Sequence, residues 1–253
     1  MMSFKEKFRG EVFTNNSGDT CEVVSYENSK KVFVRFDGYS EYEITFPIAV
    51  LRTGEFRNLN NPVILGVGFR GIGEHTPKKE YYNFVYNLWK GMLYRCYDEK
   101  TQEKIPTYKG CSVCKDWHNF QNFAEWYVNH EFYGLGYEID KDLLSPKNEK
   151  SYSPETCTLL PSSINVMIAI PEKKNRVGVL GVGKVGLSFT ATLRVDNLCS
   201  GHLGTFKTVE EASAAYVQAK ERYVKNKGLE WANRIEWKAF KALMEWKVYP
   251  DQV

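Results

Sequence analysis

The most informative stretch of the chain is Tyr137-Glu-Ile-Asp-Lys-Asp-Leu-Leu144, followed by Ser151-Tyr-Ser-Pro-Glu-Thr-Cys-Thr-Leu-Leu-Pro-Ser-Ser-Ile-Asn165. Its centre is a lysine, Lys141, between two aspartates, Asp140 and Asp142. An unperturbed lysine is almost wholly protonated near pH 7 and takes up a proton only if desolvation or a neighbouring cation lowers its pKa. Otherwise Lys141 binds anions such as phosphate as a fixed charge.

This stretch resembles the active-site hairpin and helix of the HNH nucleases found in phage homing endonucleases, which cut DNA with one divalent metal. In that family an Asp-His pair opens the motif and an asparagine on the following helix closes it. The resemblance implies that Asp140 and Asn165 bind a hard cation such as Mg²⁺, for which carboxylate and amide oxygens are suitable ligands. Lys141 takes the position of the general-base histidine, and Asp142 is a candidate to assist the metal.

Two functions follow from this resemblance. The first is a metal-dependent DNA endonuclease in which Mg²⁺ polarises the scissile phosphate and Lys141 and Asp142 are catalytic. The second is a protein that kept the architecture and lost hydrolysis, because a lysine replaces the histidine that would take the proton from water. Such a protein would bind DNA, RNA or another protein as a regulator, and residues 140–142 would be an exposed turn.

Length and composition favour a folded, intracellular protein. The chain has 253 residues, 43% of them apolar, and a net charge of +3, which is compatible with nucleic acid without requiring it. No apolar run is long enough to cross a bilayer, and the N-terminus lacks the apolar core of a signal peptide. We therefore expect no membrane partner and a cytoplasmic location, which the resemblance places in a phage-infected bacterial host.

The N-terminal region, 1–60, has the period-two pattern of short strands. The runs at 21–26 and 31–36 alternate apolar and polar residues and are separated by Asn-, Ser- and Gly-rich turns. The pattern is similar to small five-stranded Src-homology-like or Tudor-like β-barrels, which would offer a surface for a protein partner. A Gly-rich linker follows at 61–79, whose GxGxxG-like string lacks the strand and helix of a dinucleotide site.

The central region, 80–172, begins with amphipathic patterns that predict helices at about 80–97 and 120–130. Their apolar stripes are Tyr82, Val85, Leu88, Trp89, Met92 and Leu93 in the first, and Phe120, Phe123, Ala124 and Tyr127 in the second. Between them, an Arg-Cys turn at 95–96 and the Val-Cys-x-x-Trp-x-x-Phe string at 113–120 also resemble phage HNH-type proteins. We expect the two helices to brace a ββα module.

The C-terminal region, 173–253, predicts three strands and a helix, followed by a last helix at about 231–246. Thr208 and Glu211 form a capping-box pattern at the start of the first helix. The string His-Leu-Gly-Thr-Phe-x-Thr-x-Glu-Glu-Ala at 202–212 closely resembles the APETALA/ethylene-response-factor DNA-binding domain, which also occurs in phage homing endonucleases. The whole chain is thus predicted to be a multidomain α+β protein.

The resemblance implies that this sheet lies in the major groove of duplex DNA. Period-two geometry sends Ala191 and Leu193 toward the helix, so Thr190, Thr192 and Arg194 point the other way. His202 and Lys184 fall where related domains place DNA contacts. The alternative is an exposed sheet without a DNA-binding role.

Six cysteines suggest a second kind of metal site. A CxxC pair, Cys111 and Cys114, together with Cys96 and Cys157 makes a four-cysteine zinc site conceivable. The competing interpretation, which we favour, is that these are reduced core cysteines. His118 and His130 are expected to be structural.

Overall fold

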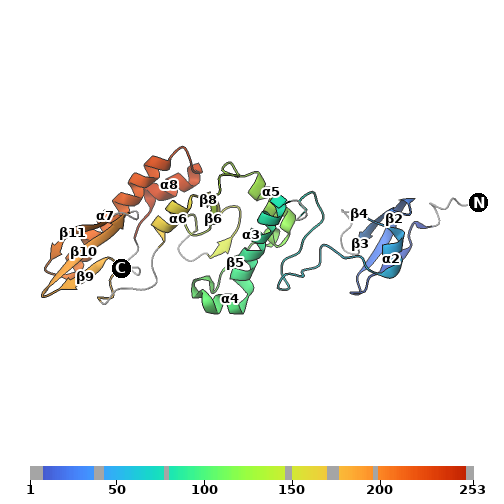
Figure 1. Cartoon of the computed structure of the whole chain (residues 1–253), viewed down its shortest axis with the longest axis horizontal. Coiled ribbons are helices and arrows are strands. Elements are labelled where there is room, and N and C mark those ends of the chain that lie inside the picture. The colour runs from blue at the N-terminus through green and yellow to red at the C-terminus, as the bar shows by residue number, and fades with distance from the viewer. Residues whose placement is uncertain are drawn as a thin grey trace, which may run out of the picture. The chain divides into compact units, whose positions relative to one another are not determined.

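The computed structural model describes residues 8–36, 43–76, 80–145, 150–169, 177–195 and 199–248 (Figure 1). The chain divides into two compact units, Met1–Tyr127 and Val128–Val253, which are described separately below. Helices and several small sheets are present, so the prediction of an α+β protein is confirmed. None of the helices among these residues combines the length and the apolar character of a membrane span.

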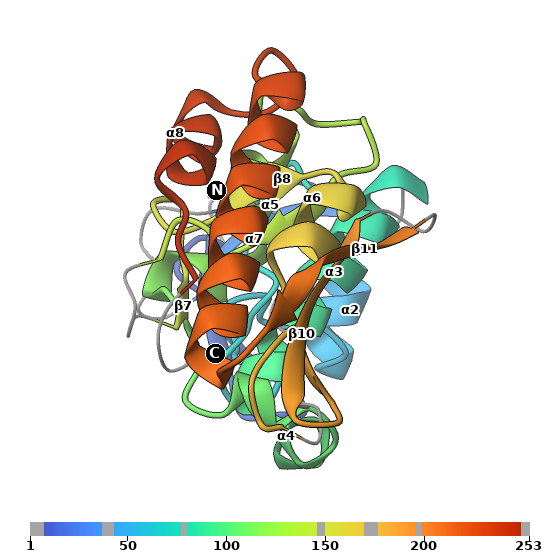
Figure 2. The same cartoon turned by 90° about the vertical axis from the view of Figure 1, so that its left-hand side faces the viewer.

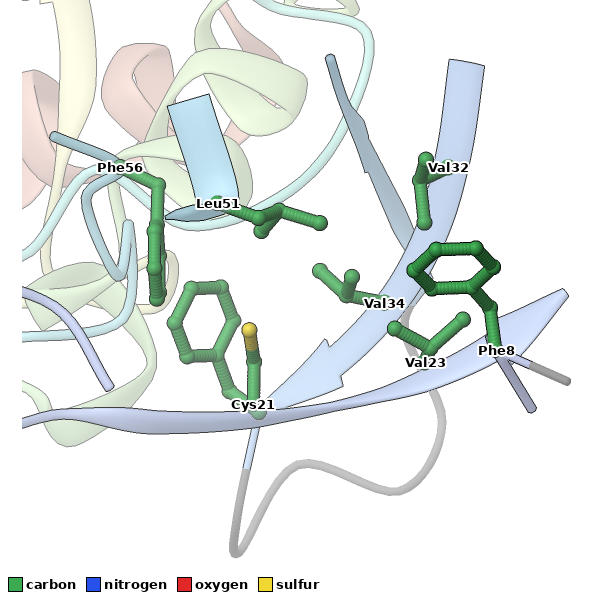
Figure 3. Close-up of a cluster of buried hydrophobic side chains, with 8 residues drawn as sticks. Phe8, Cys21, Val23, Val32, Val34, Leu51 and Phe56 are labelled. Carbon is green, nitrogen blue, oxygen red and sulfur yellow. The ribbon is translucent and has the colours of Figure 1, made fainter. Parts of the chain in front are cut away.

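The N-terminal strands form an open antiparallel sheet in the order β1-β2-β3-β4. The strands are β1 at Val12–Thr14, β2 at Thr20–Asn28, β3 at Lys31–Phe36 and β4 at Ile44–Phe46. The predicted period of two is confirmed, because Cys21 and Val23 on β2 and Val32 and Val34 on β3 are fully buried on one face. Figure 3 shows Phe8, Leu51 and Phe56 directed toward this face.

The closed five-stranded barrel predicted for this region is wrong for the described residues. After β4 the chain forms a short helix, α2 at Ile48–Thr53, in place of another strand. Pro47 supplies the extended residue before the helix, and Gly54 ends it in the left-handed region at φ 72°. Buried Leu51 joins α2 to the sheet, which remains open at β1 and β4.

Helices α3 at Glu80–Tyr97 and α5 at Phe120–Val128 carry the second core of the first unit. The residues of the two predicted apolar stripes are buried, except for Leu88, which is half-buried. The Tyr82 side chain is outside the described part of the structure. The Trp89 indole donates to the Trp117 carbonyl at 2.6 Å, and its ring packs on Phe120. Short elements connect the helices: α4 at Glu99–Lys104, η1 at Pro106–Tyr108, β5 at Ser112–Val113 and η2 at Lys115–His118.

The Gly-rich connector packs against these helices. A Cβ at Gly68 would lie 2.3 Å from Leu93 Cδ1. The backbone at Gly68 therefore lies so close to α3 that a residue with a side chain would clash there. Phe69 exchanges backbone hydrogen bonds of 2.9 Å with His118 and Phe120. The string predicted to be a linker is therefore an ordered part of this core at Ile64–Phe69.

The second unit begins with a strand pair and a helix. Strands β6 at Glu138–Asp140 and β8 at Thr158–Leu160 pair antiparallel, with Glu138 opposite Leu160 and Asp140 opposite Thr158. A short strand, β7 at Ser151–Tyr152, precedes β8, and helix α6 at Ser162–Ile168 follows it. The order of β6, β8 and α6 is that of a ββα unit.

A three-stranded antiparallel sheet follows in the order β11-β10-β9. Its strands are β9 at Val182–Val185, β10 at Ser188–Val195 and β11 at Cys199–Phe206. Gly178 and Gly181, which precede β9, adopt positive φ angles. Helix α7 at Val209–Trp231 starts with the predicted capping box, in which Thr208 Oγ1 accepts from Glu211 N at 3.2 Å.

Helix α7 belongs to two cores in succession. Its first half, through Ala212, Tyr216 and Ala219, packs on Val182, Ala191 and Leu193 of the sheet. Its second half, through Val224, packs with α8 at Trp237–Glu245 and with Leu160 and Ile164 of the ββα unit. Figures 1 and 2 show α8 running beside α7. The last helix, α8, therefore covers the ββα unit.

Replacement of Leu243 by alanine tests this packing. Leu243 of α8 is fully buried in the core that α8 shares with the ββα unit, so Leu243→Ala should lower the free energy of unfolding by about 2 to 5 kcal/mol. The matched control is Leu229→Ala at the exposed end of α7, which should change it by less than about 0.5 kcal/mol. Urea denaturation measures both, and equal effects would contradict the packing.

Candidate functional site

The first candidate site lies on one face of the β6–β8 pair. Glu138 and Asp140 are two residues apart on β6, so their side chains share a face with their cross-strand partners Leu160 and Thr158. Helix α6 presents Asn165 to the same face, where Asn165 Nδ2 donates to Glu138 Oε2 at 3.0 Å. The structure thus joins Asn165 of α6 to β6 through Glu138. Glu138 is an additional carboxylate that sequence reasoning missed.

The carboxyl group of Asp140 shapes the turn after β6. Asp140 Oδ1 accepts from the backbone N–H groups of Asp142 at 3.1 Å and Leu143 at 2.8 Å. Burial disfavours the carboxylate, and these two bonds only partly compensate. The result is that the pKa of Asp140 rises to about 6.

The Lys141 side chain is buried beside a carboxylate and an aromatic ring. It is only 6% exposed, and Nζ donates to Asp142 Oδ1, while the Asp142 side chain is 74% exposed. Nζ also lies 5.7 Å from the centre of the Tyr152 ring. A carboxylate and an aromatic face both favour the ammonium form. The two predicted catalytic residues therefore bond to each other, and the expectation that Lys141 lies in an exposed turn does not describe its side chain.

Asp140, Asn165 and Glu138 carry oxygen atoms of the kind that hard divalent cations bind. Asp140 Oδ2 accepts no hydrogen bond from the described residues. The hydrogen bond between Asn165 and Glu138 uses Asn165 Nδ2 and Glu138 Oε2, so it does not involve the Asn165 amide oxygen or Glu138 Oε1. Within the described ranges, however, no three His, Cys, Asp or Glu side chains form a group that could hold a metal by themselves. A cation here would rely on the Asn165 amide and on water, as Mg²⁺ commonly does.

A buried polar network lies behind Asp140. Thr158, its fully buried cross-strand partner, donates from Oγ1 to Glu236 Oε2 at 2.6 Å. The same Glu236 oxygen is 3.1 Å from His130 Nε2, and His130 Nδ1 accepts from the Phe132 N–H at 3.2 Å. Burial raises the pKa of Glu236, but the bonds from His130 and Thr158 and the charge of Lys238 outweigh burial and lower it.

Both ring nitrogens of His130 are engaged in this network, which agrees with its expected structural role. It does not replace the histidine missing at Lys141. Glu236 lies 96 positions beyond Asp140 in the sequence. No spacing rule could have connected them.

The second candidate site is the face of the three-stranded sheet that α7 leaves uncovered. Cross-strand pairing places Thr192 opposite His202 and Arg194 opposite Ser200, and Ala191 and Leu193 are buried beneath α7 as predicted. Thr190, Thr192, Arg194 and His202 therefore share one face, with Arg194 and His202 exposed. Thr205, the partner of Thr190, adds an exposed hydroxyl.

Lys184 lies apart from that group. It pairs with Phe189, whose side chain belongs to the core under α7, and cross-strand partners share a face. Lys184 Nζ lies 6.0 Å from the centre of the Phe189 ring. Lys184 is thus on the α7 side of the sheet, exposed at its edge.

None of the four cysteines of the conceivable zinc site forms a disulfide. Cys96 and Cys111 are buried in the first unit, where Cys114 is half-buried, and Cys157 is buried in the second. Burial raises the pKa of Cys157 to about 12, which favours the thiol over the thiolate that zinc binds. Cys157 thus has the properties of a core residue.

The raised pKa of the half-buried Asp140 carboxyl predicts a pH dependence of stability. The unfolded chain has the ordinary pKa of 3.8 and the folded chain a pKa of about 6, so the folded state holds the proton more tightly. Stability is then fully present below about pH 4 and is lost as the pH rises through 6. In Asp140→Asn, the amide oxygen can still accept from the N–H groups of Asp142 and Leu143, but the side chain does not ionise. The variant should therefore not lose stability as the pH rises, and at pH 7 its free energy of unfolding should be higher by about 1 to 3 kcal/mol.

Urea denaturation between pH 4 and 7.5 measures this difference. The control is Asp116→Asn at an exposed aspartate, which should leave the pH profile unchanged. Parallel profiles for Asp140→Asn and the unmodified chain would show that the Asp140 carboxyl is solvated.

Comparisons of the chain with protein-family models, with curated proteins and with solved structures found no match in any of the three. Assignment of function therefore depends on the geometry of the two candidate sites.

Proposed function

We propose that the chain binds duplex DNA through the uncovered face of the β9–β10–β11 sheet. The observation that carries the proposal is that Thr190, Thr192, Arg194 and His202 share this face while the apolar residues between them are buried under α7. Two hydroxyls, a guanidinium and an imidazole are groups that contact phosphates and base edges. The finer layout, an HNH-like module at 80–172 and an APETALA/ethylene-response-factor-like domain at 173–253, is part of this proposal.

The charges of the face support a nucleic-acid partner. Arg194 makes no ion pair or hydrogen bond through its side chain with any described residue. Strand pairing places six residues of β10 and β11 on this face, and none of them is acidic: Thr190, Thr192, Arg194, Ser200, His202 and Thr205. An exposed arginine without a carboxylate partner is available to a phosphate, for which its planar fork is suited.

We propose that the ββα unit of this protein occupies DNA without hydrolysing it. Buried Lys141 stands in the position where the resemblance implies a general base, and its side chain pairs with Asp142. In this proposal Lys141 remains an ammonium ion. An ammonium ion cannot take a proton from water. The unit would then act as a rigid support for the sheet, to which it is joined through α7.

Metal-dependent nicking is the second candidate function. The grouping of Glu138, Asp140 and Asn165 favours it, because these residues would hold a divalent cation, which supplies charge stabilisation at a phosphate when bound. The elevated pKa of Asp140 also favours it, since a carboxylate that is costly to bury gains most from a cation.

Loss of the Arg194 charge should weaken DNA binding. Arg194→Ala is expected to raise the Kd for a random duplex about tenfold and to reduce the slope of log affinity against log salt by about one. Fluorescence anisotropy across a salt series measures both quantities. Arg222→Ala, at an exposed arginine on α7, is the matched control and should have a smaller effect. No measurable binding by the unmodified chain at low salt would rule out the proposal.

Supercoiled plasmid with Mg²⁺ separates binding from cleavage. Under the proposal, the unmodified chain produces no more nicked circles than the Asp140→Asn variant, while both bind the plasmid. Nicking by the unmodified chain that Asp140→Asn abolishes would establish the second candidate function. Because Asp140→Asn retains the acceptor for the turn, loss of folding would not explain that result.

A further inference from the structure

A cavity of about 420 Å³ opens beside β10 in the second unit. Strand β9 pairs with β10 only at Ser188–Ala191, so the edge of β10 at Thr192–Arg194 extends past β9. The cavity lies at this edge, and its other walls come from α6, α7 and the segment that follows α8. Its volume is in the range of small-molecule sites, about 300 to 1,000 Å³.

Two cations line the cavity. Arg194 has no partner among the described residues, and Lys220 of α7 donates one hydrogen bond, from Nζ to the Met167 carbonyl at 2.5 Å. An ammonium has three donors, so two of them remain available. Burial lowers the pKa of Lys220, and no carboxylate counteracts this effect. An anion in the cavity would satisfy both side chains.

The nearest carboxylate in the sequence is already engaged. Glu221 Oε2 accepts from Lys247 Nζ at 2.7 Å, and Glu221 Oε1 accepts from the Val248 N–H at 3.3 Å. Glu221 is not among the residues that line the cavity. The charge inside the cavity is therefore positive.

The remaining walls suit a flat apolar ring. Tyr216, Tyr223 and Trp246 line the cavity, together with the hydroxyl groups of Ser163 and Thr192. Aromatic side chains bind nucleobases by stacking, and hydroxyl groups donate to phosphate oxygens or accept from base amino groups. A ligand with one anionic group and one aromatic ring matches this combination.

We propose that the cavity binds a nucleotide, with its phosphate between Arg194 and Lys220 and its base against Trp246 and Tyr223. The choice of a nucleotide among phosphate esters rests on the proposed function. Arg194 and Thr192 belong both to the uncovered sheet face and to the cavity wall, so a DNA strand that crosses the sheet reaches the cavity. The nucleotide can therefore be free or part of that strand.

Titration calorimetry of the full chain with 2′-deoxyadenosine 5′-monophosphate tests the site. This nucleotide should bind at least tenfold more tightly than 2′-deoxyadenosine, because the phosphate contacts two cations. Lys220→Met, which keeps the apolar stem, should weaken nucleotide binding at least tenfold. Lys225→Met, at a half-exposed lysine of α7 outside the cavity, should leave it unchanged. If Lys220→Met fails to fold, Arg194→Met at an exposed position provides the same test.

Equal binding of the nucleotide and the nucleoside, or nucleotide binding that survives both Lys220→Met and Arg194→Met, would overturn the site. A competing random duplex distinguishes the two sources of phosphate. Displacement of the nucleotide by the duplex would assign the cavity to the DNA strand, and simultaneous binding would assign it to a free nucleotide; both support the site.

The two proposals fail separately. Duplex binding that depends on His202 without any nucleotide binding would overturn the cavity alone. Nucleotide binding that depends on Lys220 without duplex binding would overturn the proposed function alone.

Discussion

Helix α7 determines the arrangement of the second unit, because one helix fills two hydrophobic cores. Its 23 residues span about 34 Å, which is long enough to cover the sheet with one half and the ββα unit with the other. Gly228 permits the second contact, since a Cβ there would lie 2.5 Å from Met244 Cε and 3.2 Å from Leu243 Cβ. The candidate DNA face and the candidate metal site are consequently held by one rigid element.

The cost of burying charge determines what the ββα unit can do. Asp140 and Lys141 are adjacent and both are withdrawn from water, yet they are stabilised in different ways. Lys141 has a carboxylate and an aromatic ring beside it. The Asp140 carboxyl accepts from two backbone N–H groups and is subject to the opposing charges of Lys141 and Asp142. Burial therefore raises the pKa of the Asp140 carboxyl. A divalent cation beside Asp140 would favour its carboxylate form.

Local signals in the sequence predicted the regular elements well. Alternating burial on β2 and β3, the apolar stripes of α3 and α5 and the capping box of α7 all follow from residues a few positions apart. The barrel was wrong because the chain forms α2 after β4, with Pro47 before the helix and Gly54 at its end as the start and stop signals. The connector at Ile64–Phe69 was read as a linker because its contacts are with α3 and α5, distant in sequence.

In the candidate sites too, the residues that local sequence patterns place correctly differ from those that depend on contacts between distant parts of the sequence. Thr190, Thr192 and Arg194 could be placed on one face because strand geometry alone determines their direction, whereas the face on which Lys184 lies follows from its pairing with Phe189. Glu236, Lys220 and Trp246 were missed altogether. They reach their places only because α7 and α8 return the chain to β8, α6 and β10. Tertiary packing, which no local pattern encodes, thus adds to each site the residues that decide its charge.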